Sequence, residues 1–137
     1  MTKIQNIKRN KKFEISFELV DDKNKTSVPL AQVVLSDRIK SDFIIKLRSL
    51  ITSIITYDGD RYDTEHYANV RSRAKGTYDG KQADYTRIEM TAYRDEKYIK
   101  MRFRFKHRNI YAYTDNIVDA ILSKEEADAL YDNLVAI

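Results

Sequence analysis

Apolar and polar side chains alternate strictly from Tyr98 to Lys106, and this segment constrains the fold more than any other. The apolar positions are Ile99, Met101, Phe103 and Phe105, and the polar positions are Tyr98, Lys100, Arg102, Arg104 and Lys106. Successive side chains of a strand point to opposite faces, so the pattern predicts a strand between an apolar core and an outward basic row. A one-residue slip would expose every apolar side chain of the segment, so we expect Arg102 and Arg104 to face solvent.

Turn residues predict further strands on both sides of this segment. Residues 94–97, Arg-Asp-Glu-Lys, predict a hairpin with residues 87–93, where apolar and polar side chains also alternate. His107-Arg108-Asn109 predicts the next turn, followed by a short strand over residues 110–114. A weaker alternation over residues 70–75 suggests another strand, which ends before a turn at Asp79-Gly80.

The first third of the chain carries a basic start and a predicted hairpin. Residues 1–12 are rich in Lys and Arg and poor in apolar residues, so we expect a flexible basic N-terminal arm. Alternation from Phe13 to Leu19 predicts a strand, and residues 26–35 read as the returning strand. Pro29 cannot donate a ladder hydrogen bond, which suggests that this returning strand lies at a sheet edge.

Two amphipathic helices are predicted from apolar spacing and capping residues. Ser36 or Asp37 is the expected N-cap of the first helix, which ends near Thr56. Its apolar stripe is Ile39, Phe43, Leu47, Leu50, Ile51 and Ile54. Ser123 and Glu126 form a capping-box pattern that predicts a C-terminal helix. The apolar stripe of that helix is Ala127, Leu130, Tyr131 and Leu134.

These elements predict an α+β fold with an antiparallel sheet and two helices packed on one face. The expected order is two strands, a helix, a long loop over residues 57–69, four strands and a helix. At 137 residues, with 42% hydrophobic residues, the chain has the size and apolar content of one domain. We therefore expect residues 13–137 to form a single domain behind the basic arm.

Composition also bears on the compartment. The chain has no cysteine, which excludes disulfides and thiolate zinc sites and fits a reducing environment. Its first residues are basic but lead into no apolar run, and no segment reaches the length of a membrane span. We expect a cytoplasmic protein that lacks both a standard export signal and a membrane span.

The sequence offers no catalytic set, cofactor motif or metal site. The only histidines are His66 and His107, and the glycines at 59, 76 and 80 cannot form a phosphate-binding loop. The acidic residues Asp58, Asp60, Asp63 and Glu65 invite a cation, but their spacing does not match a calcium-binding loop. Asp84 and Glu89 could suggest a metal nuclease, but the expected lysine after the second acid is absent. We therefore expect a protein that is not an enzyme.

The outward basic row is the candidate site. Lysines and arginines two positions apart on a strand lie about 7 Å apart, close to the spacing of phosphates along a nucleic-acid strand. Tyrosines between guanidinium groups are surfaces on which unpaired bases stack. The expected nucleic-acid-binding residues are Lys100, Arg102, Arg104, Lys106, Tyr98, Tyr93, Tyr111, Tyr113, Arg87, Arg71 and Arg73. The competing interpretation is an ordinary solvent face with cross-strand ion pairs, such as an arginine with Glu89.

Three functions fit this surface. The leading hypothesis is binding of single-stranded DNA or RNA. A second is a phage or mobile-element inhibitor that binds a host defence enzyme, because Tyr and Arg are also frequent in protein-binding hot spots. A third is capture of a small anionic nucleotide by the arginines. A homodimer is also possible through an edge strand, and the sequence does not separate these partners.

Overall fold

The computed structural model describes residues 2–21, 23, 28–59 and 65–137, which form an α+β fold with a large, mostly antiparallel sheet. Three strands precede the first helix: β1 (Thr2–Lys11), β2 (Glu14–Asp21) and β3 (Ala31–Ser36). Helix α1 (Asp37–Ile55) is followed by β4 (Glu65–Tyr78), β5 (Lys81–Gln82), β6 (Tyr85–Tyr93), β7 (Tyr98–Arg108) and β8 (Tyr113–Ser123). Helix α2 (Lys124–Ala136) ends the chain.

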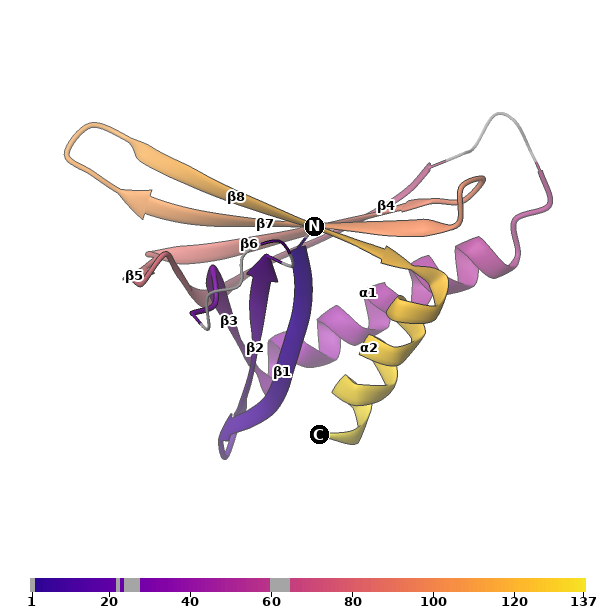
Figure 1. Cartoon of the computed structure of the whole chain (residues 1–137), viewed down its shortest axis with the longest axis horizontal. Coiled ribbons are helices and arrows are strands. Elements are labelled where there is room, and N and C mark those ends of the chain that lie inside the picture. The colour runs from indigo at the N-terminus through magenta and orange to yellow at the C-terminus, as the bar shows by residue number, and fades with distance from the viewer. Residues whose placement is uncertain (1, 22, 24–27, 60–64) are drawn as a thin grey trace.

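The strands form one sheet that bends back on itself. Their order is β3-β2-β1-β8-β7-β6-β4-β5, and β3 pairs in addition with β4. The strands β1, β2 and β3 stand at a steep angle to the long strands β4, β6, β7 and β8 (Figure 1). On the other side of the bend, β1 meets β8 in parallel at Thr2 and Ala120. The sheet is therefore a bent, nearly closed surface and not a flat layer.

Strand β4 makes the bend because it belongs to both parts of the sheet. Residues 65–70 and Ala74 pair with β6, whereas the last residues, from Lys75 to Tyr78, pair with β3. The register shifts in between, over residues 71–73. At the crossing, a Cβ on Gly76 would lie under 3.0 Å from Thr86 Oγ1 and Phe105 Cε1, so this close approach of strands requires glycine.

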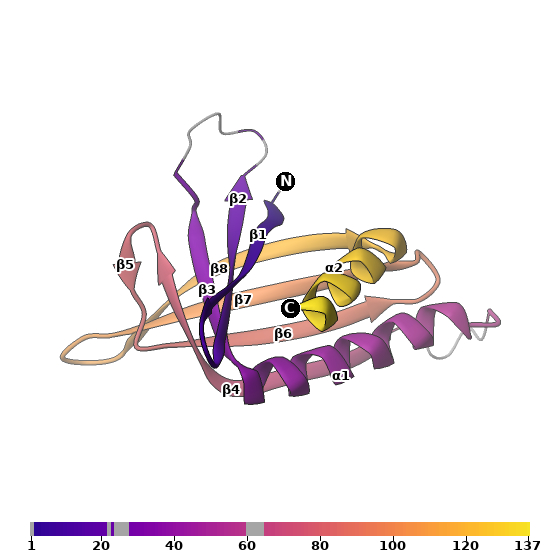
Figure 2. The same cartoon turned by 90° about the horizontal axis from the view of Figure 1, so that it is seen from below.

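Both helices lie in the angle of the bent sheet (Figure 2). They cover the inner side of the long strands and lie beside β1–β3, so the expectation of helices stacked on one flat face holds only in outline. The apolar stripe of α1 meets both parts of the sheet, and the rings of Phe17 on β2 and Phe103 on β7 make an edge-to-face contact at 5.9 Å. Neither α1 nor α2 is long and apolar enough to cross a membrane.

Both helix starts are as predicted. The Ser36 hydroxyl accepts a hydrogen bond from the Ile39 amide at 3.3 Å. Helix α1 ends at Ile55, with Thr56 as its C-cap, close to the predicted end. At α2, the Ser123 hydroxyl accepts from the Glu126 amide while the Glu126 carboxylate accepts from the Ser123 amide, both at 3.1 Å. These reciprocal bonds satisfy donors that a helix start would otherwise leave unpaired.

The N-terminal region differs from the prediction. Residues 2–11, expected within a basic arm, form β1, which pairs with β2 and places Ile4 and Ile7 against the core. Pro29 lies before β3, and β3 has neighbours on both sides, so the proline does not mark an edge. Ile4 and Ile7 are three positions apart, because the register of β1 shifts between Gln5 and Lys8, where Asn6 has a positive φ. This irregularity removes the two-residue alternation by which a strand is predicted.

The order after α1 also differs. Five strands follow the helix, and β4 begins at Glu65, well before the expected start at residue 70. The strand expected over residues 110–114 is largely wrong, because residues 109–112 form the turn and only residues 113–114 belong to β8, which continues to Ser123. The expected long loop and the turn after Asp21 fall partly on residues 60–64, 22 and 24–27, which lie outside the described residues.

Candidate nucleic-acid interface

The candidate site is the side of β4, β6, β7 and β8 that is turned away from the helices, here called the outer face (Figure 1). On β7, the four predicted apolar side chains are completely buried beneath it. Arg102 and Arg104 lie on the outer face, as the register argument predicts. They are nevertheless only half-exposed, with 32% and 24% of their side-chain surface open to solvent. Neighbouring side chains therefore cover much of each arginine.

Arg102 is held by Asp119, its cross-strand neighbour on β8. Its Nε and Nη2 atoms donate to the two carboxylate oxygens at 2.9 and 3.0 Å, a bidentate pair. This hydrogen bonding lowers the pKa of Asp119 below its ordinary value and raises the pKa of Arg102. The guanidinium is thus neutralised and fixed in orientation.

Arg104 and Lys106 are also paired. Arg104 donates to Glu89 at 3.1 Å on one side and to Asp115 at 3.3 Å on the other. Lys106 contacts Asp115 at 2.6 Å. Most of the β7 row therefore matches the competing interpretation, a face with cross-strand ion pairs. Lys100 alone in this row forms no salt bridge with a described residue.

Two further cations without a salt bridge to a described residue, Arg71 and Arg73, lie on β4. Val70 pairs with Ile88 and Ala74 with Thr86, so the three residues 71–73 of β4 lie opposite the single residue Arg87 of β6. A bulge of this kind redirects side chains and often lies near functional sites. Arg71 and Arg73 are exposed and form no salt bridge within the described part of the chain.

A small hollow opens at this bulge. It has a volume of about 210 Å³ and is lined by Arg71, Tyr85 and Arg87; we call it the arginine hollow. The Nε atom of Arg87 is buried and makes no hydrogen bond within the described structure, and it lies 3.4 Å from Glu89 Oε1. Glu89 also accepts from Arg104, so one carboxylate faces two guanidinium groups. The hollow consequently has an excess of positive charge.

The tyrosines of the outer face lie in separate places. Tyr93 and Tyr98 stack on each other with ring centroids 4.7 Å apart, at the end of the sheet formed by the β6–β7 turn. Tyr111 lies at the far end, in the β7–β8 turn, and is 93% exposed. Tyr113 begins β8, but its side chain is outside the described structure. Sequence analysis missed Tyr67, an exposed residue of β4, because the weak alternation there began too late.

The β7–β8 turn is a second feature that the sequence did not single out. Ile110 is 91% exposed beside Tyr111, at the tip of a hairpin that projects beyond the rest of the sheet (Figure 1). The Asn109 side-chain oxygen accepts from the amides of Tyr111 and Ala112 at 2.9 and 2.8 Å, and Asn109 N donates to Ala112 O. This fixed turn presents two large side chains to solvent.

The acidic residues considered as metal ligands have other contacts where they are described. The Asp84 carboxylate accepts from the backbone amide of Arg108, and Glu89 pairs with arginines. Asp60 and Asp63 fall outside the described residues, as does the side chain of Glu65. His107 is buried, with its Nδ1 atom 3.3 Å from the Asn116 amide, whereas His66 is exposed.

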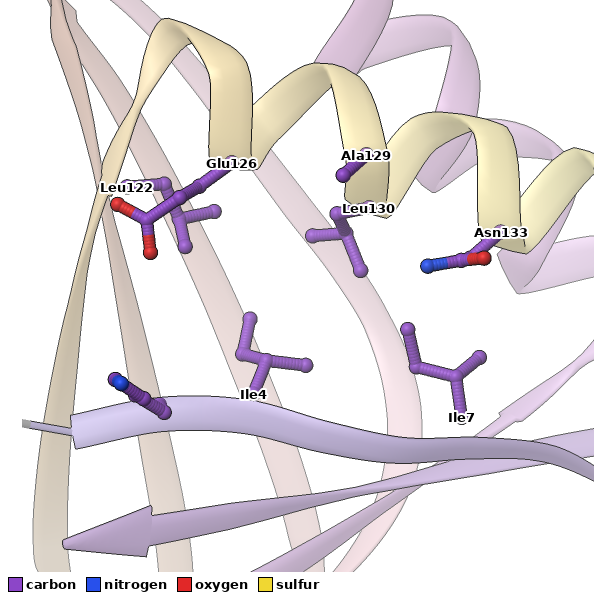
Figure 3. Close-up of a pocket in the computed structure, with 8 residues that line it drawn as sticks. Ile4, Ile7, Leu122, Glu126, Ala129, Leu130 and Asn133 are labelled. Carbon is purple, nitrogen blue, oxygen red and sulfur yellow. The ribbon is translucent and has the colours of Figure 1, made fainter. Parts of the chain in front are cut away.

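A different hollow lies on the helix side of the molecule, where β1 separates from β8. It has a volume of about 200 Å³, and its apolar residues include Ile4 and Ile7 of β1 and Leu130 of α2 (Figure 3). Lys3 and Glu126 add charges of opposite sign to its lining. It is distinct from the outer face and shares no residue with the predicted site.

The fold and this site define an α+β protein with a tyrosine-bearing sheet face, on which ion-paired arginines adjoin unpaired ones. No protein-family model matched the chain, and neither did any curated protein or solved structure.

Proposed function

We propose that the outer face binds single-stranded nucleic acid, without a catalytic step. The observation that carries this proposal is the meeting of Arg71 and Arg87 with Tyr85 in the arginine hollow. Arg73 lies on the same bulge of β4. Guanidinium groups donate bidentate hydrogen bonds to phosphate, and tyrosine rings stack on bases of any sequence. An unpaired strand offers both groups at once, whereas a duplex keeps its bases stacked inside.

The ion pairs change which residues should contact phosphates. Arg102, Arg104 and Lys106 already have carboxylate partners, so a phosphate would have to displace a partner before binding them. Arg71, Arg73 and Lys100 have no such competitor among the described residues. Arg87 has Glu89 beside it, but that carboxylate is shared with Arg104. We therefore assign the phosphate contacts to Arg71, Arg73, Arg87 and Lys100. The β7 pairs serve to hold the face in a fixed shape.

Salt dependence of binding tests this assignment. Each phosphate contact to a single strand contributes roughly 0.7 to the slope of log affinity against log salt concentration. Arg71→Ala/Arg73→Ala should lower that slope by roughly 1.4 in fluorescence anisotropy titrations with a labelled single strand. The matched control is Arg38→Ala/Lys40→Ala, which removes the same charge from α1 on the opposite side of the sheet.

Equal effects of the two double variants would mean that only net charge matters, and no binding by the unmodified protein at low salt would refute the proposal. A double-stranded oligonucleotide of the same sequence provides a second comparison. Since the tyrosines can stack only on accessible bases, the duplex should bind more weakly.

One observation favours the alternative, binding to a protein such as a host defence enzyme. The fixed turn with Ile110 and Tyr111 presents an apolar pair that a protein pocket could receive. A pull-down with the candidate enzyme tests this function. Loss of the captured enzyme in the Ile110→Ser/Tyr111→Ser variant, together with no competition by oligonucleotides, would favour the protein partner over nucleic acid.

A further inference from the structure

The charge of the arginine hollow is not matched by its surroundings. Arg71 and Arg87 line the hollow, and among the described residues only Glu89 forms a salt bridge with either of them. That carboxylate also hydrogen-bonds Arg104. Elsewhere on the outer face, Asp119 pairs with Arg102, and Asp115 pairs with both Arg104 and Lys106. Positive charge is thus concentrated at one point and does not run evenly along a track.

We infer that the arginine hollow binds a phosphate monoester, the phosphorylated end of a nucleic-acid strand; this inference rests on the proposed function. A monoester carries about −1.5 to −2 charges at neutral pH, whereas each internal phosphodiester carries one. A site with several guanidinium groups and one shared carboxylate is matched better by the more highly charged group. A terminal phosphate also exposes three oxygen atoms to donors from different directions.

The size of the hollow fits this assignment. Its 210 Å³ is below the range of about 300–1,000 Å³ typical of pockets that enclose a whole small ligand. A phosphate group can enter, while the sugar and base must remain outside on the sheet. Tyr85 also lines the hollow, and we assign stacking of the first nucleoside to it. The site therefore fits the end of a longer ligand better than a whole nucleotide.

The remaining strand has a path across the outer face. Arg87 and Tyr93 are six positions apart on β6, or about 20 Å at the rise of an extended strand. The stacked rings of Tyr93 and Tyr98 lie at that distance from the hollow, and Lys100 is two positions from Tyr98 on β7. A strand anchored by its end phosphate would reach a cation and an aromatic surface in turn.

Competition anisotropy with matched oligonucleotides tests the inference. One unlabelled strand is prepared with a 5′-phosphate, with a 3′-phosphate or with hydroxyl groups at both ends, and each competes for the full-length protein in phosphate-free buffer. We expect one of the phosphorylated strands to bind about tenfold more tightly than the hydroxyl-ended strand, which corresponds to about 1.4 kcal/mol. Equal affinities would overturn the inference and leave the proposed function intact.

Variants locate the effect. Arg71→Gln and Arg87→Gln should each reduce the preference for the phosphorylated end, while Lys100→Gln should weaken all strands alike. Arg87→Lys keeps the positive charge but loses the planar guanidinium group that donates two parallel hydrogen bonds, so it should also reduce the preference for the phosphorylated end. Because Arg71 is exposed, its variant provides the test even if substitution of Arg87 disturbs folding. An unchanged preference in Arg71→Gln would overturn the assignment to this hollow.

A mononucleotide distinguishes the two sources of a phosphate monoester. If a nucleoside monophosphate binds as tightly as the phosphorylated strand, the strand adds nothing and the strand-end inference fails. If the mononucleotide binds and no oligonucleotide does, the proposed function fails as well. Weak mononucleotide binding that Arg71→Gln abolishes, together with tight binding of the phosphorylated strand, would support both.

Discussion

Arg87 and Arg104 lie directly opposite each other on β6 and β7, and the Glu89 carboxylate contacts both. Like charges directly opposite on neighbouring strands destabilise a sheet. The Glu89 side chain is only 15% exposed, so solvent screens the two positive charges poorly. The Glu89 carboxylate therefore reduces the electrostatic repulsion between Arg87 and Arg104. It also lowers the net positive charge of the arginine hollow.

Glu89→Gln should destabilise the fold because it leaves the two arginines uncompensated. We expect a decrease of about 1–2 kcal/mol in the free energy of unfolding, measured by urea denaturation. Glu89→Gln/Arg87→Gln should recover part of this loss, since it also removes one of the opposed charges. If the change in unfolding free energy of the double variant equals the sum of the changes in the two single variants, Arg87 and Glu89 do not interact.

Arg102→Ala should cost more than an exposed substitution usually does. The change removes both hydrogen bonds to Asp119 and leaves that half-buried carboxylate without its partner. The unfolding midpoint in urea should fall by clearly more than that of Arg38→Ala on α1. An arginine that simply faces solvent, as the sequence predicts for Arg102, would change stability by only about 0.5 kcal/mol, so an unchanged midpoint would favour that simpler interpretation.

The decrease in unfolding free energy at acidic pH should depend in part on Asp119. Arg102 lowers its pKa in the folded protein below the ordinary value of 3.8. A carboxylate whose pKa is lower in the folded than in the unfolded protein stabilises the folded state at pH values above its unfolded pKa. That stabilisation is lost as the pH falls through the pKa of the folded protein. Urea denaturation at a series of pH values should therefore show a shallower loss of stability below about pH 4 in Asp119→Asn than in the unmodified protein.

Gly76→Ala should destabilise the fold by about 1–3 kcal/mol, the usual cost of overpacking a core. The added methyl group would meet Thr86 and Phe105 at contact distances that real side chains do not adopt. Thermal unfolding of the purified variant measures the effect. Thr86→Ala in the Gly76→Ala background should restore part of the stability, and failure to do so would place the clash at Phe105.

Tyr111→Ala should weaken binding of a single strand without affecting stability. The ring is almost fully exposed, so the unfolding free energy should change by no more than about 0.5 kcal/mol. Loss of one base–aromatic stack typically costs about 1–3 kcal/mol of binding free energy. Anisotropy titration measures the loss, and Tyr111→Phe, which keeps the ring, is the matched control. Equal losses in both variants would exclude stacking.

Local patterns were sufficient to predict the parts of the fold that depend on local physics. Strict alternation gave the register of β7 correctly, and hydroxyl and carboxylate spacing identified the starts of α1 and α2. These features depend on interactions among a few neighbouring residues, so a short stretch of sequence is enough to predict them. The same holds for the Asp79-Gly80 turn, whose residues both adopt positive φ.

Features that depend on distant partners could not be predicted in this way. The acids that neutralise the β7 row come from β6 and β8, and the register that aligns Arg102 with Asp119 depends on where the β7–β8 turn falls. The turn was placed too early, so β8 and its carboxylates were overlooked. The bulge at residues 71–73 interrupts the alternation of apolar and polar side chains, so the sequence predicts β4 only weakly there. Arg71 and Arg73 were predicted from their charge, while the meeting of Arg71 with Arg87 in the arginine hollow depends on strand pairing.

Because β4 is shared by both parts of the bent sheet, neither part is an independent folding unit. Strand β3 pairs with β2 on one side and with β4, which follows α1 in the sequence, on the other. A fragment that contains only β1–β3 and α1 would therefore leave one edge of β3 without its backbone hydrogen bonds. Loss of β4 would open the sheet on both sides of the bend. The protein should therefore unfold in a single cooperative transition, and fragments divided between α1 and β4 should regain structure only when mixed.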